Sequence, residues 1–199
     1  MASFPAKLAT LFLVSVLLGG VCVAQRSANL LQNPDGNGGM NFWRPSGEAN
    51  VERLANGNVC FVVRNGGYFY QDVELPPQSD SKYVLLIGHG ASERINSDSS
   101  ITGLPYLYGY MMENGRPDQK EIRSYLQGQQ MLGRSVFRDE WVKMAGIFKV
   151  PAGTTTMRFF LNQAERSGDP HNGSAARFDN LGLYLFATKE EAEAFAFQY

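Results

Sequence analysis

The stretch Ala175–Phe186, Ala-Ala-Arg-Phe-Asp-Asn-Leu-Gly-Leu-Tyr-Leu-Phe, decides the fold of this chain. Its leucines alternate with glycine and aromatic residues, and this period of two predicts a strand that is buried on both faces. Asp179 and Asn180 stand at the entrance of the strand, where polar groups are buried only if they form hydrogen bonds or hold a cation. The strand needs a partner, and we predict that the opening segment Asn29–Trp43 supplies it.

The N-terminus has the layout of a secretory signal peptide, which we place at residues 1–24. Lys7 precedes the apolar run Leu8–Leu18, and small residues lead to a cleavage site after Ala24. The run is shorter than the roughly 20 residues that a membrane helix needs, although a retained anchor is the alternative. We therefore expect a secreted, extracellular protein that has no membrane contact after cleavage.

The composition narrows the class of protein. The formal net charge is -1, so the composition indicates neither a basic surface for nucleic acid nor a polybasic patch for a membrane. Cys60 is the one cysteine that remains after cleavage, so no intramolecular disulfide can form. Its apolar neighbours indicate a buried, inert thiol rather than a nucleophile. The sequence does not indicate an oligomeric state.

Turn signals divide the chain into about nine or ten segments with the pattern of strands, as in an all-β sandwich. Thr188 followed by Glu191 predicts a capping box that opens a short helix. We therefore predict a β-sandwich domain over residues 25–187 and a short C-terminal helix over residues 188–199. The expected strands include Glu48–Leu54 and Asn58–Val63, joined at Asn56-Gly57, then Tyr68–Leu75 after a turn at Asn65–Gly67, Lys82–Gly88 with an exit loop from His89, Leu104–Met112, Glu121–Gln127, Trp141–Val150 and Thr155–Gln163.

Three blocks of sequence carry a family resemblance through their order and spacing. They are Asn29–Gly36, Gly67–Leu75, and an ending that runs from Trp141 to Leu183 and contains Phe-Lys-Val-Pro and Phe-Asp-Asn-Leu. Together they resemble the galactose-binding-like jelly-roll superfamily, and within it the secreted carbohydrate-binding modules of glycoside hydrolases. More distantly, the opening block resembles the glycan-binding domain of F-box proteins, whose tryptophan-rich ending is missing here. The resemblance implies a jelly-roll β-sandwich that binds carbohydrate.

The resemblance also implies a structural Ca²⁺ where the first loop meets the last strand. Calcium takes six to eight oxygen ligands, and Asn33, Asp35 and Asp179 are the side chains that could contribute to such a set. The sequence departs from the family here, because Asp35 comes early in the loop and Asn41 is neutral. In the alternative, Asp179 accepts hydrogen bonds from turn amides and Asp35 shapes a turn.

Sugar recognition needs flat aromatic faces and planar polar groups. Three tyrosines alternate along Leu104–Met112 and so share one face of that strand. Along Thr155–Gln163, a polar and aromatic face lies opposite an apolar one. Alternatively, each tyrosine is a structural residue of the core or its rim, with its hydroxyl hydrogen-bonded, and does not bind a ligand. The candidate ligand-binding residues are Tyr106, Tyr108, Tyr110, Arg158, Phe160 and Asn162, with Gln71 and His89 as looser additions.

The sequence gives little support to catalysis. His89 and His171 lie far apart without metal-ligand spacing, and neighbouring acids such as Asp72 and Glu74 are more typical of a solvated surface than of a glycosidase pair. We expect a secreted, non-catalytic, lectin-like carbohydrate-binding protein. The alternative is a secreted structural or extracellular-matrix protein that uses the same sandwich for assembly. Asn172 lies in an Asn-Gly-Ser sequon that a eukaryotic source could glycosylate.

Overall fold

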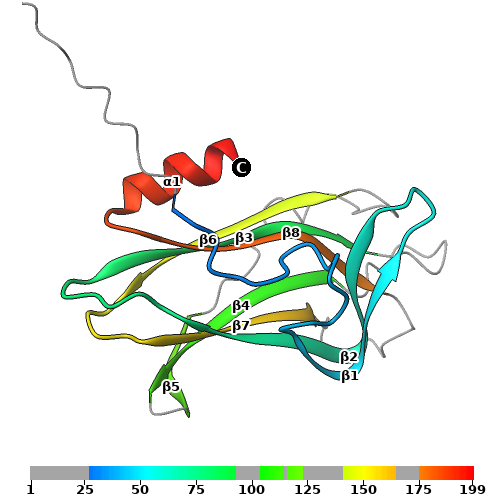
Figure 1. The fold of residues 1–199 in the computed structure, drawn as a ribbon, viewed down its shortest axis with the longest axis horizontal. Helices are drawn as coiled ribbons and strands as arrows, with labels where there is room; N and C mark the ends of the chain where they lie inside the picture. The colour runs from blue at the N-terminus through cyan, green and yellow to red at the C-terminus, as the bar shows by residue number, and fades with distance from the viewer. Residues whose placement is uncertain (1–26, 93–103, 114–115, 123–140, 165–174) are drawn as a thin grey trace, which may run out of the picture.

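The computed structural model describes residues 27–92, 104–113, 116–122, 141–164 and 175–199. Within these ranges the chain forms eight strands and one helix, arranged as a jelly-roll β-sandwich (Figure 1). The predicted fold class is confirmed. The elements are β1 (Arg44–Arg53), β2 (Val59–Glu74), β3 (Lys82–Ser92), β4 (Leu104–Glu113), β5 (Arg116–Ile122), β6 (Val142–Val150), β7 (Thr156–Ala164), β8 (Ala176–Phe186) and α1 (Lys189–Gln198).

The strands form two layers that share β2 (Figure 1). One layer has the order β5-β4-β7-β2 and the other has the order β2-β8-β3-β6, while β1 pairs with β2 beside them. The first part of β2, Phe61–Val63, pairs with β8, and its last part, Tyr68–Glu74, pairs with β7. Because one long strand crosses between the layers, the two sheets close around a common core.

The core lies between the two layers. Alternate residues of β7 point into it, and Met157, Phe159 and Leu161 are fully buried, as the alternation predicted. Trp43 joins them from the segment before β1, with its ring centroid 4.9 Å from that of Phe61 and 6.0 Å from that of Phe159. Each such side chain contributes about 1.5–3 kcal/mol through burial, so the chain is stabilised without a disulfide.

The closing strand β8 pairs with the opening segment, as predicted. The N–H group of Leu30 donates to the carbonyl of Leu183 (2.8 Å), and the N–H group of Leu181 donates to the carbonyl of Pro34 (3.1 Å). The side chain of Asn29 acts like a further strand residue: its Nδ2 donates to the carbonyl of Leu181 (2.9 Å) and its Oδ1 accepts from the N–H group of Leu183 (3.1 Å). The two ends of the domain are therefore held together by backbone-directed hydrogen bonds.

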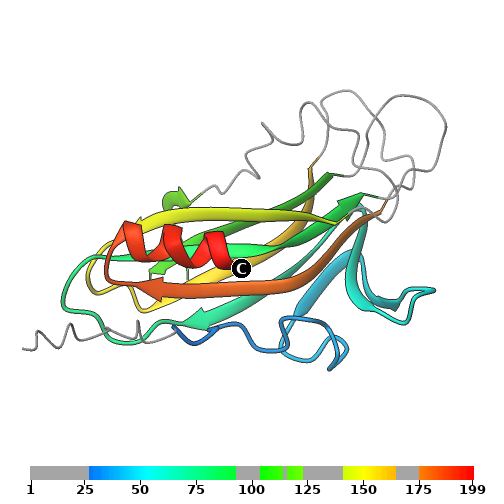
Figure 2. The same ribbon diagram turned by 90° about the horizontal axis from the view of Figure 1, so that it is seen from above.

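The second face of β8 packs against α1, which lies along the β6-β3-β8 layer (Figure 2). The ring of Phe195 lies 4.6 Å from that of Tyr184 and 5.4 Å from that of Phe186. The capping box is confirmed, because the Thr188 side chain accepts from the N–H group of Glu191 and the Glu191 side chain accepts from that of Thr188. The prediction that β8 is buried on both faces is thus confirmed.

The predicted turn at Asn65–Gly67 was wrong. β2 runs without a break from Val59 to Glu74, and β1 pairs with it on both sides of this point, Ser46 with Tyr68 and Glu48 with Arg64. The extra residues form a bulge in which Asn65 and Gly66 take positive φ angles of 48° and 72°. Asn and Gly tolerate this left-handed conformation, so the same residues that favour a turn can also serve a bulge.

Two other strand boundaries differ from the prediction. β3 continues through His89 to Ser92, because β6 and β8 pair with it on either side, Lys143 and Asp179 both lying opposite His89. β5 spans Arg116–Ile122 rather than Glu121–Gln127, and residues 123–127 lie outside the described ranges. The polar residues from His89 onward suggested a loop, but the neighbouring strands pair with this segment through backbone hydrogen bonds and keep it in β3.

Several predictions fall on residues outside the described ranges, namely the signal peptide at residues 1–24, His171 and the sequon at Asn172. In the part of the chain that the structure describes, no helix has the length and apolar character needed to cross a membrane. Cys60 is buried, as predicted, and burial raises the pKa of its thiol to about 11. At neutral pH the thiol is therefore protonated and unreactive.

Candidate functional site

The outer face of β2, β7 and β4 gathers side chains from three strands. Tyr70 of β2 pairs with Phe160 of β7, which pairs in turn with Tyr108 of β4. Residues two apart on a strand share a face, so the neighbouring rows lie on the same side of the sheet. We call these nine positions the aromatic face: the central row Tyr70, Phe160 and Tyr108, with the rows Tyr68, Asn162 and Tyr106 on one side and Asp72, Arg158 and Tyr110 on the other.

Phe160 is the hub of the aromatic face. The ring of Tyr108 stacks on it with a centroid distance of 4.5 Å and an interplanar angle of 3°, and the ring of Tyr110 meets it edge-on at 5.5 Å and 81°. Tyr70 and Tyr68 lie 5.6 and 5.9 Å from it on the β2 side. These aromatic pairs each contribute about 0.5–1.5 kcal/mol beyond burial, so the rings are held in fixed positions.

The aromatic face carries an ordered ion pair. Arg158 donates from Nε to Oδ1 of Asp72 (2.6 Å) and from a terminal nitrogen to Oδ2 (2.8 Å). This bidentate hydrogen bonding raises the pKa of Arg158, and its guanidinium lies 4.4 Å from the centroid of the Tyr70 ring. Arg158 is therefore held over the ring of Tyr70, and two of its five N–H groups donate to Asp72, which leaves further donors at the site.

The structure brings the predicted ligand-binding residues together. The register of β4 and β7 places Tyr106, Tyr108 and Tyr110 beside Asn162, Phe160 and Arg158 on one face. Of Tyr106, the structure gives the register position and not the side chain.

The sequence interpretation missed the contribution of β2, which is Tyr68, Tyr70 and Asp72. Their alternation with the buried residues Phe69 and Val73 was the signal that could have shown their outward direction.

Two residues that the sequence suggested as looser additions do not lie on the aromatic face. Gln71 is buried on the opposite side of β2, where its amide exchanges two hydrogen bonds with the backbone of Gln32 (2.8 and 2.9 Å). His89 belongs to β3 in the other layer, and its ring stacks on that of Tyr199 at 6.2 Å. Burial lowers the pKa of His89, so its environment favours the neutral imidazole.

The three predicted calcium ligands all accept hydrogen bonds from N–H groups. Oδ1 of Asn33 accepts from the backbone of Gly38 (2.8 Å), and both carboxylate oxygens of Asp35 accept from Asn37 (3.0 and 2.6 Å). In Asp179, Oδ1 accepts from the N–H group of Asn180 (2.7 Å) and Oδ2 from the side chain of Asn58 (2.9 Å).

These contacts match the alternative in which the three side chains shape turns and hold amides. In the described ranges, no three His, Cys, Asp or Glu side chains are grouped so as to hold a metal ion. The calcium site that the resemblance implies stays a prediction.

The fold has counterparts among solved structures, although no family model and no curated protein matches the chain. The xylan-binding domain CBM22-1 of Xyn10C from Paenibacillus barcinonensis has a TM-score of 0.52 and 13% identity, covering 81% of this chain and 97% of that one. The tandem CBM22-1-CBM22-2 domain of the same enzyme has a TM-score of 0.53 and 14% identity, covering 83% and 47%.

The enzymatically active domain of tailspike protein 4 from bacteriophage CBA120 is also similar, with a TM-score of 0.49 and 13% identity, over 79% of this chain and 21% of the tailspike. This chain therefore spans about a fifth of that phage domain. At these identities the likeness concerns the fold. The chain has a jelly-roll β-sandwich fold like that of the CBM22-1 domain, and this is the fold that the sequence resemblance implied.

Proposed function

We propose that this protein binds a carbohydrate chain on its aromatic face and does not catalyse its cleavage. The observation that supports the proposal is the aromatic face itself, in which four tyrosine rings surround Phe160 and an arginine–aspartate ion pair lies beside them. α1 covers the other layer, whereas the rings at this face are half-buried, so part of each remains in contact with solvent.

The chemistry of the aromatic face suits a sugar. A pyranose has apolar C–H faces that pack on aromatic rings, and hydroxyl groups that pair with planar donors and acceptors. Arg158, the tyrosine hydroxyls and the amide of Asn162 can supply such hydrogen bonds from fixed positions. Because the rings and the ion pair are already ordered, binding costs little conformational entropy.

The proposal of a non-catalytic role rests on the acids of the aromatic face. Both oxygens of Asp72 already accept hydrogen bonds from Arg158. A glycosidase needs two carboxyl groups that flank the scissile bond, one to donate a proton and one to act as nucleophile or base. Asp72 is occupied as the partner that positions Arg158.

The signal-peptide layout supports secretion, so we place the protein outside the cell.

A glycan array with the mature chain tests the proposal, followed by titration calorimetry on the glycans retained. Phe160→Ala removes the hub of the aromatic face, and Tyr108→Ala removes the ring stacked on it. We expect each variant to lower the affinity at least about tenfold, which corresponds to about 1.4 kcal/mol. The array also indicates which glycan is bound.

Phe197→Ala is the matched control, because it removes an aromatic ring that is 88% exposed on α1, away from the aromatic face. It should leave the affinity unchanged. Binding that survives both Phe160→Ala and Tyr108→Ala would contradict the assignment of the site. If no glycan is retained at all, the proposed function is wrong, and the assembly role becomes the one to examine.

A further inference from the structure

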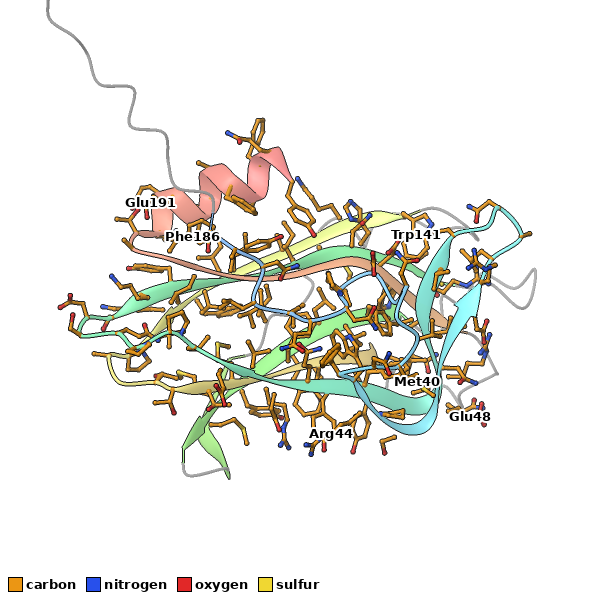
Figure 3. The ribbon with its side chains drawn as sticks, in the orientation of Figure 1. Met40, Arg44, Glu48, Trp141, Phe186 and Glu191 are labelled. Carbon is orange, nitrogen blue, oxygen red and sulfur yellow. The ribbon has the colours of Figure 1, made fainter. Side chains whose placement is uncertain are left out.

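The edge of the aromatic face at β1 carries a second set of exposed groups. Arg44, the first residue of β1, pairs with Tyr70, and its guanidinium lies 5.7 Å from the centroid of the Tyr70 ring. One of its terminal nitrogens is 3.5 Å from the Tyr70 hydroxyl. Figure 3 shows Arg44 beyond the lower layer, on the side away from α1. Arg44 therefore extends the aromatic face by one strand.

Phe42 stands two residues before Arg44 and is 65% exposed, whereas Trp43 between them is 4% exposed and lies in the core. An exposed phenylalanine gains nothing from burial. Its φ angle is 70°, in the left-handed region that a bulky side chain seldom adopts and that costs on the order of 1–3 kcal/mol. An exposed aromatic ring on a strained backbone is a feature that folding alone does not favour.

The loop before Phe42 is built to hold this conformation. Nδ2 of Asn33 donates to the carbonyls of Gly39 (2.8 Å) and Asn41 (3.2 Å), and Nε1 of Trp43 donates to the carbonyl of Asn33 (3.0 Å). These bonds tie the end of the loop to one residue, Asn33, through both its side chain and its backbone carbonyl. The ring of Phe42 is thus presented to solvent from a fixed position next to the anchor Trp43.

The charge of Arg44 is only partly compensated. In the described part of the chain, the hydrogen bond to Tyr70 and the nearby carboxylate of Asp72 raise the pKa of Arg44. Both oxygens of that carboxylate already accept hydrogen bonds from Arg158, so Arg44, Arg158 and Asp72 together keep a net positive charge. The next acid on that strand, Glu74, is four residues from Tyr70, roughly 13 Å at the rise of a strand. Glu48 is four residues from Arg44 on β1 and accepts a hydrogen bond from Asn65. At physiological salt, charges beyond about 8 Å are largely screened.

We propose that Phe42, Arg44 and the hydroxyl of Tyr70 form a subsite for a uronic acid, a sugar that carries a carboxylate, within the bound glycan. The inference rests on the proposed function and adds the class of glycan. The guanidinium matches a carboxylate in two parallel hydrogen bonds, the aromatic ring of Phe42 packs against the sugar, and the subsite continues the aromatic face at its β1 edge.

Affinity electrophoresis with three acidic polymers tests the inference: glucuronoxylan, polygalacturonate and polymannuronate, each beside its carboxyl-reduced, neutral form. We expect at least one acidic form to bind roughly five- to tenfold more tightly than its neutral counterpart, and the difference to shrink in 0.5 M NaCl. Arg44→Gln should abolish the difference and keep the binding of the neutral form. Phe42→Ala should weaken both forms alike.

Arg53→Gln is the matched control, because it removes the same charge from the other end of β1, where Arg53 donates to the carbonyl of Gly57. It should keep the preference for the acidic form. Equal affinity for the acidic and neutral forms, or a preference that survives Arg44→Gln, overturns the inference and leaves the proposed function standing. Failure of every acidic polymer to bind also overturns it, even if the array retains other glycans.

Discussion

Asn29→Ala is the most informative test of how the chain ends stabilise the sandwich. The Asn29 side chain donates to the carbonyl of Leu181 and accepts from the N–H group of Leu183, so its loss leaves two backbone groups of a buried strand without these partners. Leaving a buried group unsatisfied costs about 1–3 kcal/mol, and we expect a total loss of roughly 2–4 kcal/mol in the free energy of unfolding. For a domain of this size, that lowers the melting temperature by about 5–15 °C.

Urea unfolding followed by the fluorescence of the buried Trp43 measures the effect. Asn37→Ala is the matched control, because Asn37 is exposed and, among the residues that the structure describes, bonds only to Asp35 in its own loop. It should change the free energy of unfolding by less than about 0.5 kcal/mol. Asn29→Asp keeps the acceptor and loses the donor, so it should also destabilise. If Asn29→Ala stays within about 0.5 kcal/mol of wild type, the hydrogen bonds between the chain ends do not contribute as argued.

Three further predictions concern single sites. Gly67→Ala would place a Cβ 2.7 Å from the Glu48 carbonyl oxygen, so it should lower the free energy of unfolding measured in urea by about 1–3 kcal/mol. An unchanged free energy of unfolding would show that the β1-β2 bulge relaxes to accept the methyl group. The hydrogen bonds from Arg64 lower the pKa of Glu52 below its ordinary value of 4.5, so the ion pair stabilises the fold above pH 4.5 and this stabilisation is lost as the pH falls. Glu52→Gln should therefore lose less stability than wild type between pH 6 and pH 3.5, by less than about 1 kcal/mol because the pair is partly exposed. An equal loss in both proteins would contradict this. If the chain holds calcium, added Ca²⁺ should raise the melting temperature and Asp179→Ala should abolish the gain, whereas identical melts in Ca²⁺ and in chelator would refute the site.

Patterns within one element predicted the local structure well. The alternation in β7 identified its buried residues Met157, Phe159 and Leu161, and Thr188 with Glu191 identified the start of α1. These signals are reliable because they depend on neighbours a few residues away: a strand alternates its faces every residue, and a capping box joins residues three apart. The sequence also predicted that the opening segment pairs with β8.

Long-range pairing decided what the local pattern could not. Asn65–Gly67 has the composition of a turn, yet β1 pairs with the chain on both sides and makes it a bulge within β2. His89 lies in a polar segment, yet strands on both sides keep it in β3. In both places the hydrogen-bonding partners lie far away in sequence, so composition alone could not reveal them.

By itself, the sequence determined the sandwich class, the two buried faces of β8 and the two strands that carry most of the candidate binding residues. The tertiary structure decided the composition of the aromatic face. It joined Tyr70 to Phe160 across β2 and β7, and it placed Arg44 beside Tyr70 through the register of β1. The physical reason is that register depends on how whole strands pair, and a shift of one residue would turn every side chain of a strand to the opposite face.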